Sequence, residues 1–157
     1  MTDGEFEELF TQHRQAVWAF FARRLADRAR AEELAQDVFL AVLKNAGRYR
    51  PDAPIRSYLF GIAFRMLAAE RRKRGREGPA IDVAAPQHDA DAVLFVRQAL
   101  DRLSDSDREI VMLREFDQLS YDDIASVLEI PVNTVRSRLF RARMELHRWL
   151  SIPIPKP

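Results

Sequence analysis

Apolar residues recur every three or four positions along most of this chain, a pattern typical of helices with one buried face. The spacing predicts helices over about residues 4–25, 30–46, 55–73 and 93–103. A further helix is predicted to begin after Ser104 or Ser106, since serine is a favourable N-cap, with Ile110, Val111, Leu113 and Phe116 inside. The predicted fold class is therefore all-α.

The most informative pattern runs from residue 120 to residue 143, where two helices are separated by a short break. Ser120 is a favourable N-cap for the first of them, whose apolar face is Ile124, Ala125 and Leu128. Pro131 ends the break, because proline can open a helix but cannot lie inside one. The second helix is predicted to start at about Val132, with a core stripe of Val132, Val135, Leu139, Ala142, Leu146 and Trp149.

The opposite face of this last helix is basic. It carries Asn133, Ser137, Phe140, Arg141 and Met144, with Arg136 and Arg143 on one shoulder. Residues 132–150 contain five arginines and one acid, whereas residues 93–131 contain four basic residues and nine acids. An outward phenylalanine among arginines suits the major groove of DNA. The pattern favours a DNA-binding helix-turn-helix over the alternative, an ordinary helical hairpin with a solvated basic face.

Residues 75–92 differ in composition from the segments on either side. They are rich in glycine, proline and small residues, carry one basic residue against four acids, and predict a flexible linker. The sequence therefore predicts two small helical domains, residues 1–74 and 93–150, and a proline-rich tail at 151–157. Residues 65–76 form a second basic stretch, with Glu70 as its only acid.

Two surfaces of the first domain leave alternatives open. Leu40 falls among polar residues on the outer side of the second helix, which fits either a protein interface or a lone exposed leucine. The third helix is apolar on more than one side, with Phe60, Phe64 and Leu67 away from its main stripe. These residues fit packing on both sides, or aromatic rings that stack on unpaired bases.

Enzyme chemistry is not indicated. The chain has no cysteine, and His13, His88 and His147 lack the spacing of metal ligands, so neither a metal nor a cofactor is expected. His13 and His147 are interpreted as residues on helix surfaces. The acidic N-terminus does not resemble a signal peptide and no apolar run is long enough to span a membrane, which predicts a cytoplasmic protein.

The segment LSDSDREIVMLREFDQLSYDDIASVLEIPVNTVRSRLFRAR resembles region 4 of the extracytoplasmic-function (ECF) sigma factors, small bacterial sigma factors of RNA polymerase. AEELAQDVFLAVLKNAGRY and SYLFGIAFRMLAAERRKR resemble their region 2. The resemblance implies a region 2-like helical bundle and a region 4-like helix-turn-helix. It also implies that the chain binds polymerase core and directs transcription initiation at promoters with particular −35 and −10 elements.

The resemblance also implies roles for individual residues. Docking on the clamp helices of the beta-prime subunit is implied for Glu33, Gln36, Asp37, Phe39 and Leu40. Reading of the −35 element is implied for Asn133, Thr134, Arg136, Ser137, Phe140, Arg141 and Arg143. Opening and reading of the −10 element are implied for Tyr58, Phe60, Phe64, Arg65, Arg71 and Arg72. The beta flap and an anti-sigma factor are the further partners implied.

Three positions depart from the family pattern. Arg65 and Ala69 stand where the family often has asparagine and aspartate, and Tyr58 replaces a common tryptophan, which suggests an unusual −10 element. The rival hypothesis is a stand-alone helix-turn-helix repressor or activator, which would normally dimerise on a palindrome. Such a protein would need neither the domain before the linker nor the outward surface from Asp37 to Leu40.

Overall fold

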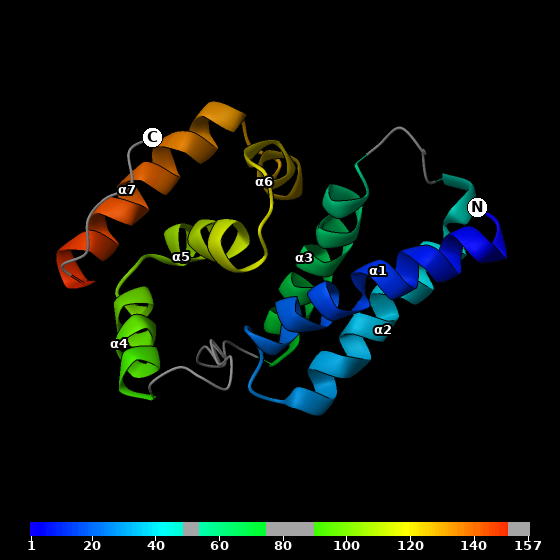
Figure 1. The fold of residues 1–157 in the computed structure, drawn as a ribbon, viewed down its shortest axis with the longest axis horizontal. Coiled ribbons are helices and arrows are strands. Elements are labelled where there is room, and N and C mark those ends of the chain that lie inside the picture. Colours follow the sequence, from blue (N-terminus) through cyan, green and yellow to red (C-terminus); the bar gives the residue numbers. More distant parts are fainter. Residues whose placement is uncertain (49–53, 75–89, 151–157) are drawn as a thin grey trace. The chain divides into compact units, whose positions relative to one another are not determined.

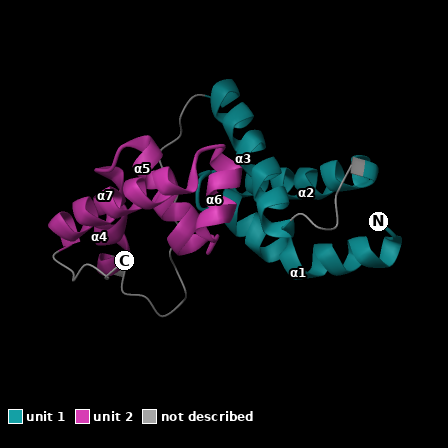
Figure 2. Cartoon of the chain, turned by 90° about the horizontal axis from the view of Figure 1, so that it is seen from above, with its two compact units in different colours: residues 1–81 teal, residues 82–157 magenta. Residues whose placement is uncertain are grey.

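The structure, a computed structural model, describes residues 1–48, 54–74 and 90–150. Within these ranges all regular structure is helical, as the sequence predicted. The chain divides into two compact units, residues 1–81 (unit 1) and 82–157 (unit 2), as Figure 2 shows. The division falls inside the predicted linker at 75–92. Residues 75–89 of that linker and the predicted tail at 151–157 lie outside the described residues, and residues 90–92 already belong to a helix.

Unit 1 contains three long helices that each contact the other two, α1 (Asp3–Ala22), α2 (Arg28–Lys44) and α3 (Ile55–Arg74) (Figure 1). A short 3-10 turn, η1 (Ala46–Arg48), follows α2. Thr2 and Glu5 form a capping box at the start of α1, in which each side chain accepts a hydrogen bond from the other residue's backbone N–H. Asp27 caps α2 through a hydrogen bond from the backbone N–H of Arg30.

Aromatic rings fill the core of unit 1. Phe20 packs edge-on against both Phe21 and Phe60, with ring centroids 5.1 and 5.7 Å apart. Phe10 of α1 meets Phe39 of α2 in the same manner, at 5.0 Å. These contacts join all three helices, so the outer faces of α2 and α3 are held in fixed directions.

Unit 2 is arranged around its last helix. Its elements are α4 (Ala90–Asp101), α5 (Asp105–Val111), a π-helical turn η2 (Met112–Phe116), α6 (Tyr121–Leu128) and α7 (Val132–Leu150). Helix α7 contacts α4, α5 and α6. Ser104, one of the two predicted caps, accepts a hydrogen bond from the backbone N–H of Asp107. Among the fully buried side chains of this unit are Leu100, Ile110, Leu113, Leu119, Ile124 and Leu139, whereas Phe116 is only half-buried.

Candidate functional site

The predicted helix-turn-helix is formed by α6 and α7. Ser120 caps α6, with its hydroxyl oxygen 3.0 Å from the backbone nitrogen of Asp123. Helix α6 ends at Glu129, which adopts the left-handed conformation with φ of 56°. The carbonyl of Pro131 then accepts hydrogen bonds from the backbone N–H groups of Thr134 and Val135 at the start of α7. The break predicted at residues 129–131 is therefore the turn between the two helices.

The buried side of α7 follows the predicted stripe in its first half. Val135, Leu139 and Ala142 are buried, and Val132 and Leu146 are half-buried. Trp149 was predicted to lie in the core, and this is wrong. It is 40% exposed near the end of the helix, and the guanidinium of Arg102 lies 3.8 Å from the centre of its ring. The Arg102 guanidinium stacks on the Trp149 ring and so covers part of a side chain that no neighbouring helix buries fully.

The outer face of α7 presents the residues that the sequence assigned to it. Asn133, Arg136, Ser137, Phe140, Arg141 and Met144 are all exposed, and Phe140 is 50% exposed. Thr134 is half-buried, and its carbonyl accepts a hydrogen bond from the Ser137 hydroxyl. Arg136 donates to the side-chain oxygen of Asn133 at 2.9 Å. These side chains form one polar, basic face with an apolar ring within it.

Two arginines of α7 reach back to acids on the preceding elements. Arg141 pairs with Asp107 of α5, with Nη2 2.8 Å from Oδ1, and this hydrogen bond raises the pKa of Arg141. Arg143 pairs with Glu115 of η2 and lies 3.5 Å from the Tyr121 hydroxyl. The side chain of Arg143 is only 24% exposed, compared with 62% for that of Arg141. The Arg143 side chain is thus directed towards η2 and α6, a direction that sequence periodicity did not predict.

In unit 1, the outer face of α2 carries most of the residues that the resemblance assigns to polymerase docking. Glu33 and Gln36 are exposed, Asp37 is half-buried, and Leu40 is 59% exposed, as its outward position predicted. Phe39 is buried, with its ring 5.0 Å from that of Phe10, so it is a core residue and its implied docking role is not carried by an exposed ring.

The exposed apolar surface on α2 is larger than the sequence indicated. Leu43 is also exposed, one helical turn after Leu40. The two leucines lie beside an open groove of about 700 Å³, lined by Asp37, Leu40, Ala41, Leu43, Lys44 and Met66. An exposed leucine pair beside a groove is more typical of a protein interface than a single exposed leucine. Sequence periodicity could have identified Leu43 by its spacing from Leu40.

Helix α3 does not present all of the aromatic rings assigned to it. Phe60 is fully buried against Phe20, so its assignment to the −10 element is corrected to a core residue. Leu67 is buried as well, which confirms packing on both sides of the helix for these two residues. Tyr58, Phe64 and Arg71 are half-buried, and Arg65 and Arg72 are exposed.

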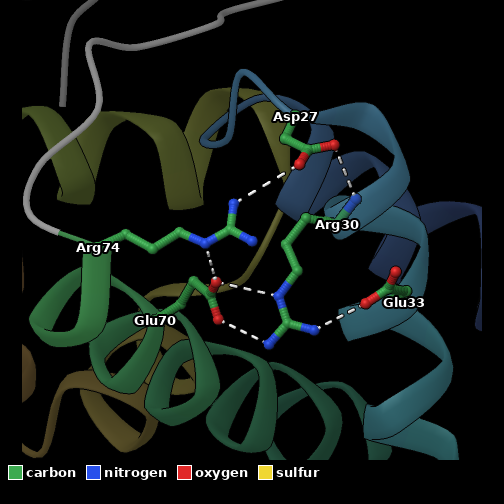
Figure 3. A network of polar contacts seen from close by, with 5 residues as sticks. All are labelled: Asp27, Arg30, Glu33, Glu70 and Arg74. Carbon is green, nitrogen blue, oxygen red and sulfur yellow. Dashed lines mark hydrogen bonds and ion pairs between the residues drawn. The ribbon is translucent and has the colours of Figure 1, made fainter.

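The polar network in Figure 3 connects the basic end of α3 to the start of α2. Glu70 is buried, and its carboxylate oxygens lie 3.0 and 2.8 Å from Nε and Nη2 of Arg30. Arg74 pairs with Glu70 and with Asp27, and Arg30 also pairs with Glu33. Hydrogen bonding by Arg30 lowers the pKa of Glu70. In the sequence Glu70 is the single acid of a basic stretch, and this isolation is the signal that could have indicated a paired role.

Two histidines, His13 of α1 and His147 of α7, lie in the described part of the chain. His13 and His147 are half-buried, not plain surface residues, and burial beside Arg56 lowers the pKa of His13. In the described ranges, no cluster of three or more His, Cys, Asp or Glu side chains is placed to hold a metal ion. Leu94 and Phe95 of α4 are exposed apolar side chains that the sequence pattern did not single out.

None of the helices in the described part of the chain combines the length and apolar character that crossing a membrane requires.

Comparison with known proteins assigns a family to both units. The Sigma-70 region 2 family matches residues 9–77, and the Sigma-70 region 4 family matches residues 96–146. The chain is 30% identical to the RNA polymerase sigma-H factor of Pseudomonas aeruginosa, over 92% of this chain and 86% of that protein. It is 32% identical to the ECF RNA polymerase sigma factor SigK of Mycolicibacterium vanbaalenii, over 94% of this chain and 82% of that protein.

A solved structure shows the same fold. The sigma factor RpoE of Bartonella quintana, determined in complex with the anti-sigma factor NepR, superposes with a TM-score of 0.78 at 24% identity. The match covers 94% of this chain and 98% of that chain. The identities and coverage of the relatives, together with the two family matches in their expected order, lead to one conclusion: the chain belongs to the ECF sigma factors of RNA polymerase.

Proposed function

We propose that this sigma factor binds RNA polymerase core through α2, reads the −35 element with α7, and opens and reads the −10 element with α3. The observation that carries the proposal is the presence of a region 2 unit and a region 4 unit in one chain. Unit 1 exposes polar and apolar side chains on α2 that suit a protein interface, and unit 2 exposes a basic face on α7 that suits DNA. Polymerase and promoters are found in the cytoplasm, which is where the chain would act.

Docking on the clamp helices of the beta-prime subunit is proposed for the exposed side of α2. Glu33, Gln36 and Asp37 supply polar groups, and Leu40 and Leu43 supply apolar contact beside the groove. Interfaces commonly combine an apolar centre with a polar rim in this way. Phe39 contributes indirectly, because its buried ring supports the backbone of α2 from within.

Sequence reading in the −35 element is proposed for the outer face of α7. Arginine forks to the O6 and N7 atoms of guanine, and an apolar group such as Phe140 contacts the methyl of thymine. Arg136, Ser137, Phe140 and Arg141 are exposed and lie in the part of the helix that enters the groove. Asn133 and Thr134 lie at its N-terminus, where phosphate contacts are favoured. We assign Arg143 to the support of this face, because it is paired with Glu115 and Tyr121.

The opened −10 strand is proposed to lie along α3. Arg65 and Arg72 are exposed, and Arg71, Tyr58 and Phe64 are half-buried beside them on the same helix. Basic and aromatic side chains together bind single strands through phosphate contacts and stacking. Bases that leave the duplex can then be captured individually. Arg65 and Ala69 support the expectation that the element differs from the one most relatives read.

Two further partners are proposed for the chain. The beta flap is the polymerase element that the resemblance assigns to the region 4 unit. Inhibition by an anti-sigma factor is supported by the solved relative of similar fold, whose sigma factor is held by the anti-sigma factor NepR.

Run-off transcription on a library of genomic fragments, with purified polymerase core, tests the proposal. The expected result is a small set of specific start sites that appear only when the chain is added. Failure to initiate above the level of core alone would contradict it. The rival, a stand-alone repressor or activator, predicts specific duplex binding without core and no initiation. That rival is not favoured, because residues 9–77 match region 2.

A further inference from the structure

Asp107 occupies an unusual position for an acid close to a DNA-binding face. It lies in the first turn of α5, is buried, and donates its backbone N–H to the Ser104 hydroxyl at 3.3 Å. This hydrogen bond fixes the backbone at the start of α5. The carboxylate of Asp107 is then directed to one neighbour on the last helix, Arg141.

The pair between Asp107 and Arg141 is bidentate. Oδ1 lies 2.8 Å from Nη2 and Oδ2 lies 3.4 Å from Nε, so the carboxylate faces one edge of the guanidinium. Arginine has five N–H donors in a planar fork, and this arrangement engages one on Nε and one on Nη2. Of the three that remain, one on Nη1 and one on Nη2 lie along the terminal edge, and the second on Nη1 points to the side of Cδ. The Arg141 side chain is 62% exposed although Asp107 is buried, so the guanidinium stays accessible from solvent.

Three other arginines of α7 are held differently. Arg136 donates to Asn133, three residues earlier on its own helix. Arg143 is mostly covered by Glu115 and Tyr121. Arg148 lies 3.7 Å from Glu145 in an exposed, same-helix pair, which orders a side chain weakly. Of these four residues, Arg141 combines an exposed guanidinium with a buried carboxylate from another element that sets its plane.

We propose that Asp107 is a specificity-determining residue of the −35 interface, which holds the Arg141 guanidinium in the orientation that forks to a guanine. This inference rests on the proposed function, because it requires Arg141 to read a base. A long side chain held by one edge loses little further rotamer freedom when its other edge meets the base. Asp107 itself touches no DNA in this arrangement and acts only through Arg141.

The proposal predicts opposite effects on specificity and on general affinity. Replacing Asp107 by asparagine removes a negative charge close to the phosphates, which leaves non-specific binding unchanged or strengthens it. The same change releases Arg141 into many orientations and weakens its choice of base. We expect discrimination at the positions read by Arg141 to fall roughly 3- to 10-fold, part of the value of a good bidentate pair. A general loss of folding would instead lower both quantities together.

The experiment uses polymerase core loaded with the full chain and promoters that carry each base at each position of the −35 element. Four proteins are compared: the unchanged chain, Asp107→Asn, Arg141→Ala and the control Asp105→Asn. Asp105 is a matched control because it is an exposed acid in the same turn of α5, and it pairs with Arg108 in an i,i+3 contact. We expect Asp107→Asn to relax preference at the same positions as Arg141→Ala, and Asp105→Asn to leave it unchanged.

The outcomes separate this proposal from the proposed function. If Arg141→Ala relaxes preference and Asp107→Asn does not, the role of Asp107 is overturned while base reading stands. Stronger binding by Asp107→Asn with an unchanged preference would also overturn it, since the charge of Asp107 would then only weaken the attraction of this face to DNA. If Arg141→Ala has no effect on preference, base reading fails and the role of Asp107 fails with it.

A second measurement keeps the proposal testable if Asp107→Asn does not fold. Nitrogen relaxation at the Nε atoms of the unchanged, free chain compares Arg141 with Arg148. We expect an order parameter near that of rigid backbone, about 0.85, for Arg141 and a value below about 0.6 for Arg148. Equal mobility of the two side chains would overturn the proposal without any substitution.

Discussion

The buried Glu70 of α3 and the partly buried Arg30 of α2 form a bidentate ion pair, with Oε1 3.0 Å from Nε and Oε2 2.8 Å from Nη2. The two residues are 40 positions apart in the chain, so the pair links the start of α2 to the end of α3. Arg74 pairs with the same carboxylate at 2.9 Å. The basic end of α3 is therefore fixed to the helix that is proposed to dock on polymerase.

Removing the charge of Glu70 should destabilise unit 1. Glu70→Gln leaves the partly buried Arg30 without its main partner, and we expect a loss of about 1–3 kcal/mol in the free energy of unfolding. The chain has two tryptophans, Trp18 in α1 and Trp149 in α7. Urea unfolding followed by Trp18 fluorescence in a Trp149→Phe background reports on unit 1 alone. Glu33→Gln is the control, because Glu33 is an exposed partner of the same arginine and its loss should cost little.

The same pair predicts a pH dependence with a defined sign. The pKa of Glu70 is lowered in the folded chain, chiefly by hydrogen bonding from Arg30. Its contribution is therefore complete above the unfolded pKa, about 4.3, and is lost as the pH falls through the lower folded value. The difference in unfolding free energy between the unchanged chain and Glu70→Gln should be constant from about pH 7 to 5 and shrink below about pH 4.5. A difference that grows on acidification would contradict this assignment.

The proposed docking surface predicts a selective loss of core binding. Asp37→Arg reverses a charge beside Leu40 without altering the buried stripe of α2, so we expect binding to polymerase core to weaken at least about tenfold, or 1.4 kcal/mol. Titration of labelled chain with core measures this directly. Glu8→Arg makes the same change on an exposed position of α1 and should bind as the unchanged chain does. Equal affinities for the two variants would place the docking surface elsewhere.

The turn of the helix-turn-helix predicts a stabilising substitution. Glu129 ends α6 with φ of 56°, a conformation that costs a side-chain-bearing residue about 1 kcal/mol and glycine almost nothing. Glu129→Gly should raise the unfolding free energy of unit 2 by up to about 1 kcal/mol. Ser126→Gly, at an exposed position inside α6, should lower it by roughly 0.5 kcal/mol. Trp149 fluorescence in a Trp18→Phe background gives both values, and a loss of stability in both variants would refute the prediction.

Helical periodicity accounts for what the sequence predicted well. Leu40 and Phe140 fall on polar faces of strongly periodic helices, and the structure exposes both. Ser120 and Ser104 cap helices because the cap is a local interaction between residues three apart. The division of the chain between residues 81 and 82 lies within the segment whose composition changes.

Contacts between distant segments explain what the sequence did not predict. Phe60 lies off the main stripe of α3, but α1 supplies Phe20 to bury it. Trp149 follows the stripe of α7 past the point where neighbouring helices cover it. Arg143 and Glu70 are directed by partners 28 and 40 residues away, a separation that periodicity cannot relate. The resemblance to a family gave the function, and the geometry then decided which of the implied residues are free to act.

The outer face of α7 is proposed to read sequence and to do more than attract DNA. Arginine at a base edge contributes discrimination, whereas arginine at a phosphate contributes affinity that falls with salt. Arg148 is the internal comparison, because it is an exposed arginine on the same helix beyond the part proposed to enter the groove.

Selection of promoters with a randomised −35 element, by core loaded with the unchanged chain, Arg141→Ala or Arg148→Ala, is the most direct measurement. We expect Arg141→Ala to relax the selected sequence at particular positions by about 1–3 kcal/mol in discrimination. We expect Arg148→Ala to select the unchanged sequence with equal or slightly lower affinity. Selection of the same sequence by the Arg141 variant and by the unchanged chain would refute base reading and leave α7 as a basic helix attracted to DNA.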